Sequence, residues 1–174
     1  MHEINVAHKT AYMGLLVALG LILSYVESLI PFFYGIPGMK LGLANLMVLI
    51  TMDLLGNGPA LLVNLLRIVL AGFLFGNLYS ILYSLAGALL SFGVMVLLRK
   101  KDFGLMGISA AGGIFHNLGQ LLVAMLVVET WNVGYYAPVL VLSGLVTGLL
   151  IGFISGLLLP YLRNVVQGIR KGSS

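Results

Sequence analysis

The sequence predicts an all-α membrane protein, a bundle of six transmembrane helices with both termini in the cytoplasm. Of its residues, 60% are hydrophobic and only 8% are charged, whereas soluble domains carry about 25% charged residues. Apolar stretches suited to crossing a bilayer follow one another along nearly the whole chain. Because only short segments interrupt these stretches, residues 1–174 are expected to form a single integral membrane domain with no separate soluble domain.

Prolines, glycines and one basic segment indicate where the expected helices end. Pro31 stops the first apolar run, and Gly56-Asn57-Gly58-Pro59 makes a turn whose proline suits the start of a helix. Gly76-Asn77 and the basic segment 99–102 separate further runs, and Pro160 ends the last one. A spanning helix needs about 20 residues. The expected helices cover about residues 10–30, 40–55, 60–75, 78–98, 105–128 and 137–159, of which the second is short.

The positions of lysine and arginine predict the orientation, because cytoplasmic loops carry an excess of these residues. With an even number of helices, both termini lie on one side of the membrane. That side would carry Lys9, Arg99, Lys100, Lys101, Arg163, Arg170 and Lys171, whereas the other has Lys40 and Arg67 lies inside a helix. Both termini are therefore expected in the cytoplasm. The net charge of +4 reflects this topology, and no nucleic-acid partner is expected.

Polar side chains inside the expected helices indicate a solute-binding site. A charged group at membrane depth costs about 2.5–3.5 kcal/mol or more, so it normally faces protein or a water-filled cavity. Arg67 lies about 12 Å from the start of its helix, and Glu27, near the outer end of the first helix, is a candidate partner. On the fifth helix, His116 and Gln120 are one turn apart. The expected substrate-binding residues are Glu27, Lys40, Asn45, Arg67, Tyr83, His116, Asn117 and Gln120.

The same residues also have a structural interpretation. Membrane bundles use polar side chains as interhelical contacts worth about 0.6 kcal/mol on average, and a pair between Arg67 and Glu27 would hold two helices together without any solute. The concentration of polar groups from four helices at one depth, with nearly apolar inner halves, favours a polar cavity open to the outside.

Aromatic residues gather on the expected outer side, where most of them would form an interfacial belt. Tyr34 and Trp131 lie in the two longest outer loops. These two residues are therefore candidates for a lid over a bound ligand.

Two patterns of small residues predict close contacts between helices. On the sixth helix, a ridge at a spacing of four residues is expected to pack within the bundle; it consists of Gly144, Gly148, Gly152 and Gly156. On the first helix, the cytoplasmic half carries a small face on which a partner membrane subunit would dock; it consists of Ala11, Gly14 and Ala18.

Missing residues and motifs exclude several classes of enzyme. The chain has no cysteine, which rules out disulfides and thiolate metal sites. Enzymes that join isoprenoid diphosphates hold magnesium with paired aspartate-rich motifs, whereas here Asp53 and Asp102 are far apart in the sequence. There is also no P-loop, no Gly-x-Ser-x-Gly motif and no histidine and carboxylate cluster suited to zinc. We expect that the chain is not an enzyme and binds no metal or cofactor. Any energy that its function needs would therefore come from partner subunits.

Several longer motifs resemble those of a known membrane family. They are Ser24-Tyr25-Val26-Glu27-Ser28-Leu29-Ile30-Pro31, Pro37-Gly38-Met39-Lys40-Leu41-Gly42-Leu43-Ala44-Asn45, Leu66-Arg67-Ile68 with Gly72 and Phe75-Gly76, Ser84-Leu85-Ala86-Gly87, and the run from His116 to Ala124. In these motifs the sequence resembles the Gx transporter family, which is also labelled heptaprenyl diphosphate synthase component I. The resemblance covers nearly the whole chain.

This resemblance implies similarity to the S components of energy-coupling factor transporters. Such subunits have six helices, bind a solute near the outer surface, and associate with a membrane coupling subunit and two cytosolic ATPases. The small residues that provide the docking face would correspond to Gly14 and Ala18, with glycine where alanine is more usual. The implied location is the cytoplasmic (inner) membrane of a prokaryote, and the solute would be vitamin-like, for instance a flavin or an isoprenoid or quinone precursor.

Two other functions stay open from the sequence. The first is a membrane anchor or regulatory subunit of a heptaprenyl diphosphate synthase, in line with the older label, component I. The second is a standalone channel. A channel would need polar groups in both halves of the membrane, whereas the polar side chains of the expected site are confined to the outer half.

Overall fold

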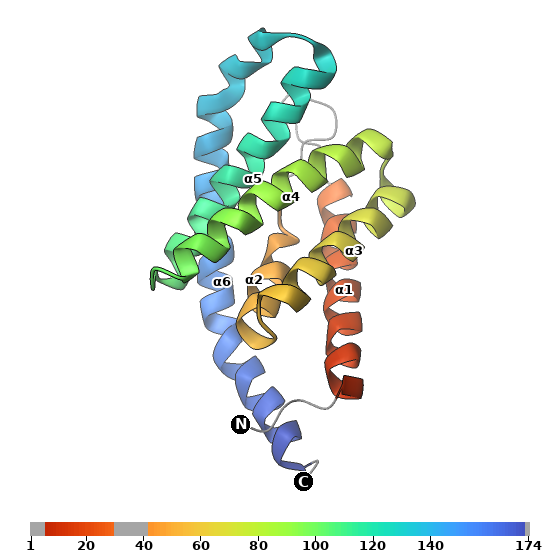
Figure 1. Cartoon of the computed structure of the whole chain (residues 1–174), viewed down its shortest axis with the longest axis vertical. Coiled ribbons are helices and arrows are strands. Elements are labelled where there is room, and N and C mark those ends of the chain that lie inside the picture. Colours follow the sequence, from red (N-terminus) through yellow and green to blue (C-terminus); the bar gives the residue numbers. More distant parts are fainter. Residues whose placement is uncertain (1–5, 30–41, 173–174) are drawn as a thin grey trace.

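The computed structural model describes residues 6–29 and 42–172, and in this part of the chain all regular secondary structure is helical. Tight turns link α2 to α3 and α3 to α4, and a 3-10 helix, η1, leads directly into α6 (Figure 1). The helices are α1 (Val6–Leu29), α2 (Asn45–Leu54), α3 (Asn57–Phe75), α4 (Leu78–Arg99), α5 (Leu105–Val128), η1 (Trp131–Tyr136) and α6 (Ala137–Gly172).

Five of these helices are long and apolar enough to cross a membrane, namely α1, α3, α4, α5 and the helical stretch that includes α6. Helix α2 has only 10 residues, which corresponds to about 15 Å or half the thickness of the hydrocarbon core. Within the described residues, the expected six-helix bundle therefore consists of five helices of spanning length and one half-length helix.

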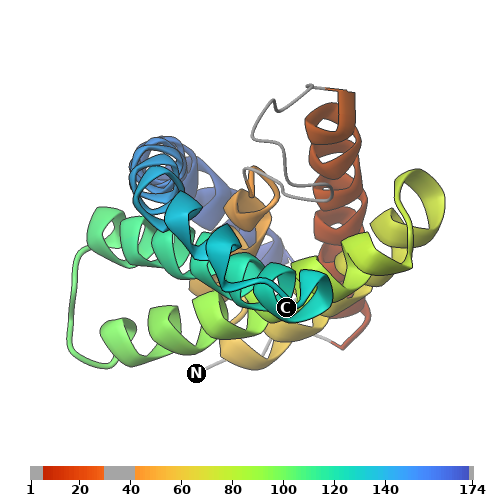
Figure 2. The same cartoon turned by 90° about the horizontal axis from the view of Figure 1, so that it is seen from above.

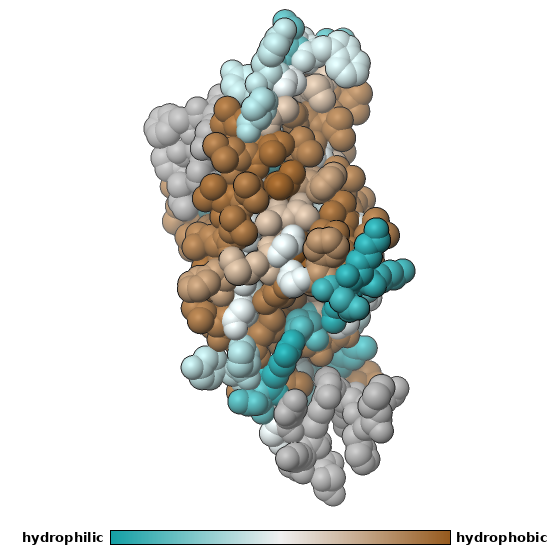
Figure 3. Space-filling view, turned by 90° about the vertical axis from the view of Figure 1, so that its left-hand side faces the viewer, coloured by the Kyte–Doolittle hydropathy of each residue, from teal (hydrophilic) through white to brown (hydrophobic). Residues whose placement is uncertain are grey.

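On the face that Figure 3 shows, hydrophilic residues lie toward the two ends and a mainly apolar band lies between them. We call one end the basic end and define it by Lys9, Arg99, Lys100, Lys101 and Arg163. The opposite end carries exposed aromatic side chains, and we call it the aromatic end, defined by Tyr79, Trp131, Tyr135 and Tyr136. Helix α1 begins and α6 ends at the same end of the molecule (Figure 1), as expected for two termini on one side of a membrane. That this side is cytoplasmic stays a prediction.

Helix α2 lies in the middle of the bundle, between α1, α3 and the pair α5 and α6 (Figure 2). Leu49 and Met52 pack in one core cluster with residues of α3 to α6, whereas Met47 and Ile50 pack in another with Leu16 of α1. Seven of the ten residues of α2 are buried. The shortest α-helix is therefore held in the core of the bundle.

The glycine ridge on α6 packs against α5, as the sequence predicts. A Cβ atom at Gly113 of α5 would lie 2.2 Å from the carbonyl oxygen of Gly144, and one at Gly148 would lie 2.5 Å from that of Ser109. Gly152 makes a similar close contact with the backbone of Met106, while Gly156 has only an ordinary contact. Small residues thus allow the backbones of α5 and α6 to touch.

The end predicted for the sixth helix is wrong, because Pro160 lies inside α6 and the helix continues to Gly172. A proline removes one hydrogen bond, here to the carbonyl of Gly156, and it can kink a helix without ending it. In an apolar environment a continuing helix satisfies all its other backbone groups internally. The expected starts differ too: α1 begins at Val6, α3 at Asn57 and α2 at Asn45.

Candidate functional site

Arg67 is buried at the contact between α1 and α3. Its Nη2 donates a hydrogen bond to Oδ1 of Asn64, one turn earlier, at 2.6 Å, and its Nη1 donates to Oγ of Ser24 on α1 at 3.3 Å. Gly20 of α1 makes room for the aliphatic part of the arginine, because a Cβ there would lie 3.0 Å from Cδ of Arg67. Its third nitrogen, Nε, is buried and has no hydrogen-bond partner in the described part of the chain. The Nε–H of Arg67 is therefore a buried donor for which the described residues supply no acceptor.

The turn before α2 joins three of the expected site residues. The backbone N–H of Gly42 donates a hydrogen bond to Oε1 of Glu27 on α1. Gly42 has a φ of +83°, a conformation that glycine adopts at little cost. A Cβ atom at this position would lie 3.0 Å from Nδ2 of Asn45 and 3.4 Å from Cδ2 of His116. Glu27, Asn45 and His116 thus gather around Gly42, and Glu27 also interacts electrostatically with Arg67.

His116 and Gln120 form the α5 side of this group. They are one turn apart, and Nε2 of Gln120 lies 3.1 Å from Nε2 of His116, so the amide donates to the ring nitrogen. Gln120 is 1% exposed, and its Oε1 has no hydrogen-bond partner in the part of the chain that the structure describes. Gly87 of α4 lies against this pair, since a Cβ there would be 3.0 Å from Cγ of Gln120. We call the whole group the polar cluster; it consists of Ser24, Glu27, Gly42, Asn45, Asn64, Arg67, His116 and Gln120.

The other expected site residues lie apart from these contacts or outside the described chain. Asn117 points to α6 and donates a hydrogen bond to the carbonyl oxygen of Leu140 at 2.9 Å. Tyr83 is buried on α4, whereas Trp131 is 83% exposed in η1 at the aromatic end. Lys40 and Tyr34 lie outside the described residues. The roles of Tyr83, Asn117 and Trp131 in binding stay predictions.

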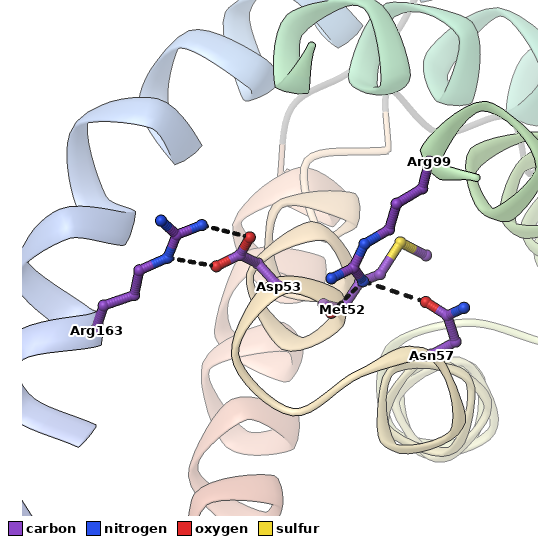
Figure 4. Close-up of polar contacts among 5 residues, drawn as sticks. All are labelled: Met52, Asp53, Asn57, Arg99 and Arg163. Atoms are coloured by element: carbon purple, nitrogen blue, oxygen red, sulfur yellow. Dashed lines mark hydrogen bonds and ion pairs between the residues drawn. The ribbon is translucent and has the colours of Figure 1, made fainter. Parts of the chain in front are cut away.

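A second polar network lies at the basic end and was not predicted from the sequence (Figure 4). Asp53 of α2 accepts two hydrogen bonds from Arg163 of α6, at 2.6 and 2.8 Å. Arg99, the last residue of α4, donates from Nη1 to the carbonyl oxygen of Met52 and, at 3.2 Å, to Oδ1 of Asn57. These contacts join the end of α2, the start of α3 and the end of α4, and they connect α2 to the interior of α6. The residues are up to 110 positions apart, so no local pattern could have paired them.

Asp53 and Asp102, which the sequence separates widely, both line one pocket beside this network. The pocket has a volume of about 260 Å³, and Arg99 and Phe103 also line it. Within the described residues, no group of three or more histidine, cysteine or acidic side chains is arranged to hold a metal ion. Of the acidic residues that line the pocket, Asp53 is already paired with Arg163 of the basic-end network.

In a comparison with models of known protein families, residues 16–158 match the family described as heptaprenyl diphosphate synthase component I. The chain belongs to this family. The resemblance found in the sequence motifs is thereby confirmed, and the matched range of this component I protein includes the entire polar cluster. No curated protein and no solved structure matches the chain.

The family description has consequences for partners but not for the solute. A component I implies further subunits, and the five apolar helices of spanning length in residues 6–29 and 42–172 fit a membrane setting. The name assigns this component to a synthase. The sequence has no aspartate-rich motif of the kind that holds magnesium in enzymes that join isoprenoid diphosphates.

Proposed function

We propose that the chain is the solute-binding membrane subunit, or S component, of an ATP-driven energy-coupling factor transporter. The observation that carries this proposal is the polar cluster, which combines groups from α1, α2, α3 and α5. Purely structural contacts tend to satisfy every buried polar atom. Here Nε of Arg67 and Oε1 of Gln120 are buried without partners among the described residues, as groups that await a ligand would be.

The half-length helix α2 adds support. Helices that stop within the membrane are tolerated where their ends are buried in protein or line a cavity, and transporters use such ends to form substrate sites. The first residue of α2, Asn45, belongs to the polar cluster. A bound solute would therefore meet the start of this helix.

The donors and acceptors of the cluster favour a particular class of solute. Arg67 offers a cationic donor, and Oε1 of Gln120 offers an acceptor, whereas Glu27 already accepts a hydrogen bond from Gly42. We propose a solute with an anionic or acceptor group and a separate donor, such as a flavin or an amphipathic isoprenoid or quinone precursor. Lys40 would add a second cation to this site, and Tyr34 and Trp131 would cover it.

Delivery of the solute would depend on partner subunits. Ala11, Gly14 and Ala18 are exposed on α1, and a Cβ at Gly14 would have nothing within 4 Å. A smooth face of this kind lets another helix approach closely in a membrane. We propose that a membrane coupling subunit docks there and that cytosolic ATPases drive transport.

The competing proposal is a membrane anchor or regulatory subunit of heptaprenyl diphosphate synthase, which the family description favours. Affinity purification separates the two functions. The transporter proposal expects the tagged chain to co-purify with a coupling subunit and ATPases. Co-purification with a prenyl synthase, and never with those subunits, would support the anchor.

Native mass spectrometry of the purified chain tests the site itself. The wild type is expected to carry a small molecule, and Arg67→Ala and His116→Ala are each expected to lose it. A hydrogen bond to a charged group contributes about 1.5–3 kcal/mol, so the affinity should fall about 10- to 100-fold for Arg67→Ala. Arg99→Ala is the matched control, because it removes a hydrogen-bonded arginine at the basic end. Equal retention by Arg67→Ala and Arg99→Ala would contradict the proposed site.

A further inference from the structure

An apolar groove lies between α1, α2 and α6 in the half of the molecule nearer the basic end. Its volume is about 190 Å³, and its lining includes Tyr12 and Leu16 of α1, Met47 and Ile50 of α2, and Leu158 and Leu162 of α6. Apart from the hydroxyl of Tyr12, every side chain that lines the groove is apolar. The groove is separate from the polar cluster.

The groove has a buried floor and an exposed rim. Leu16, Met47 and Ile50 form the floor and are at most 7% exposed, whereas Leu19 and Leu158 on the rim are each 40% exposed. These rim residues belong to helices of spanning length, so the groove opens toward the lipid. A cavity with apolar walls does not hold ordered water, and a hydrocarbon chain from the bilayer fits its chemistry.

Tyr12 indicates that the occupant is more than a plain hydrocarbon. Its hydroxyl is buried and has no hydrogen-bond partner in the described part of the chain. A buried hydroxyl without a partner is unfavourable, and a tyrosine at the rim of an apolar region normally directs its polar tip to an acceptor. The ester carbonyl at the head of a lipid chain is such an acceptor.

Charge at the mouth of the groove favours an anionic headgroup. Lys9 is exposed and lies three residues before Tyr12, which places the two side chains on neighbouring positions of one helix face. Arg163 follows Leu162, another lining residue, and is already paired with Asp53. Lys9 is therefore the cation best placed to meet a lipid phosphate.

We propose that this groove binds one chain of an anionic phospholipid, with the ester carbonyl accepting a hydrogen bond from Tyr12 and the phosphate beside Lys9. The inference does not depend on the solute. Leu15 of the groove lies one helical turn from Ala11 of the small α1 face that we assign to the coupling subunit, so the proposal concerns the chain without that subunit. It commits to a lipid, so a partner helix or a second copy of the chain in the groove would contradict it.

The full-length chain, delipidated in detergent and mixed with phosphatidylglycerol or phosphatidylcholine, tests the proposal by native mass spectrometry. The wild type should retain one phosphatidylglycerol. Leu158→Trp fills the groove and should weaken retention about tenfold or more, equivalent to about 1.4 kcal/mol. The control is Leu157→Trp, because Leu157 is 55% exposed on the same helix and does not line the groove. Equal retention by the two variants would overturn the proposal.

Two milder variants test the headgroup contacts without changing the volume of the groove. Tyr12→Phe should weaken retention of both lipids, and Lys9→Gln should reduce the preference for phosphatidylglycerol over phosphatidylcholine. Lys101→Gln, an exposed lysine in the loop between α4 and α5, should leave that preference unchanged. If lipid never binds while Leu158→Trp abolishes a dimer or assembly with another subunit, the groove is a protein interface and the lipid proposal fails.

Discussion

Replacing Gly42 with alanine tests whether the turn before α2 holds the polar cluster together. The substitution has two effects: it strains the backbone at a φ of +83°, and it pushes a Cβ to within 3.0 Å of Nδ2 of Asn45. To relieve the second effect, either the Asn45 side chain or the backbone at Gly42 must move, and we expect the backbone movement to break the hydrogen bond from the Gly42 N–H to Glu27. Gly56→Ala is the matched control, because Gly56 has a φ of +93° but a Cβ there would have nothing within 4 Å.

The expected magnitudes separate these effects. Backbone strain costs about 1–3 kcal/mol at either position. Loss of the hydrogen bond to a buried carboxylate adds about 1.5–3 kcal/mol for Gly42→Ala alone. In a chain of this length each kcal/mol lowers the melting temperature by about 2–4 °C, so Gly42→Ala should unfold about 3–12 °C below Gly56→Ala.

The assay is thermal unfolding in detergent, combined with native mass spectrometry of the co-purified small molecule. Gly42→Ala is expected to lose the solute, and Gly56→Ala to keep it. Identical melting temperatures and identical retention would show that Gly42 only terminates a turn, and the role assigned to its contacts with Glu27 and His116 would be refuted.

Two further predictions concern stability. Gly113→Ala should lower the melting temperature sharply, because its Cβ would lie 2.2 Å from the carbonyl oxygen of Gly144. Gly93→Ala, where a Cβ meets nothing within 4 Å, should raise the melting temperature slightly, because alanine stabilises a helix interior by up to about 1 kcal/mol relative to glycine. The reverse order would contradict the close packing of α5 and α6. Asp53→Asn should lower the free energy of unfolding by only about 0.2–1 kcal/mol, because Arg163 is 55% exposed. This loss of stability should be smaller at high salt than at low salt. A loss that does not depend on salt would argue against an exposed ion pair.

The sequence was most informative where apolar runs have clear polar borders. The predicted helix 105–128 coincides with α5, because a basic loop precedes it and a polar segment follows it. The ridge at Gly144 was correctly assigned to packing, since small residues at a spacing of four permit backbone contact. Pro160 misled the prediction because proline marks a helix end only where the freed backbone groups can find other partners.

Within the candidate site, the prediction succeeded for neighbours in sequence and for the interaction of Glu27 with Arg67, but it missed the contacts made by the turn before α2. His116 and Gln120, expected one turn apart on the fifth helix, lie side by side, with 3.1 Å between their Nε2 atoms. Asn117 follows His116 directly, yet a rotation of about 100° per residue turns its side chain toward α6. The contact between Gly42 and Glu27 depends on a turn whose conformation no short motif specifies.

The half-length helix α2 shows how a short rod of aligned peptide dipoles can be held inside an apolar bundle. Its leading end meets the carboxylate of Glu27 through Gly42, and its trailing end meets the guanidinium of Arg99 through the carbonyl of Met52. Negative charge is thereby placed at the positive pole and positive charge at the negative pole. Because the two charges come from α1 and α4, movement of α2 along its axis in either direction would stretch one of these contacts and compress the other, and the bundle therefore fixes its central helix in register.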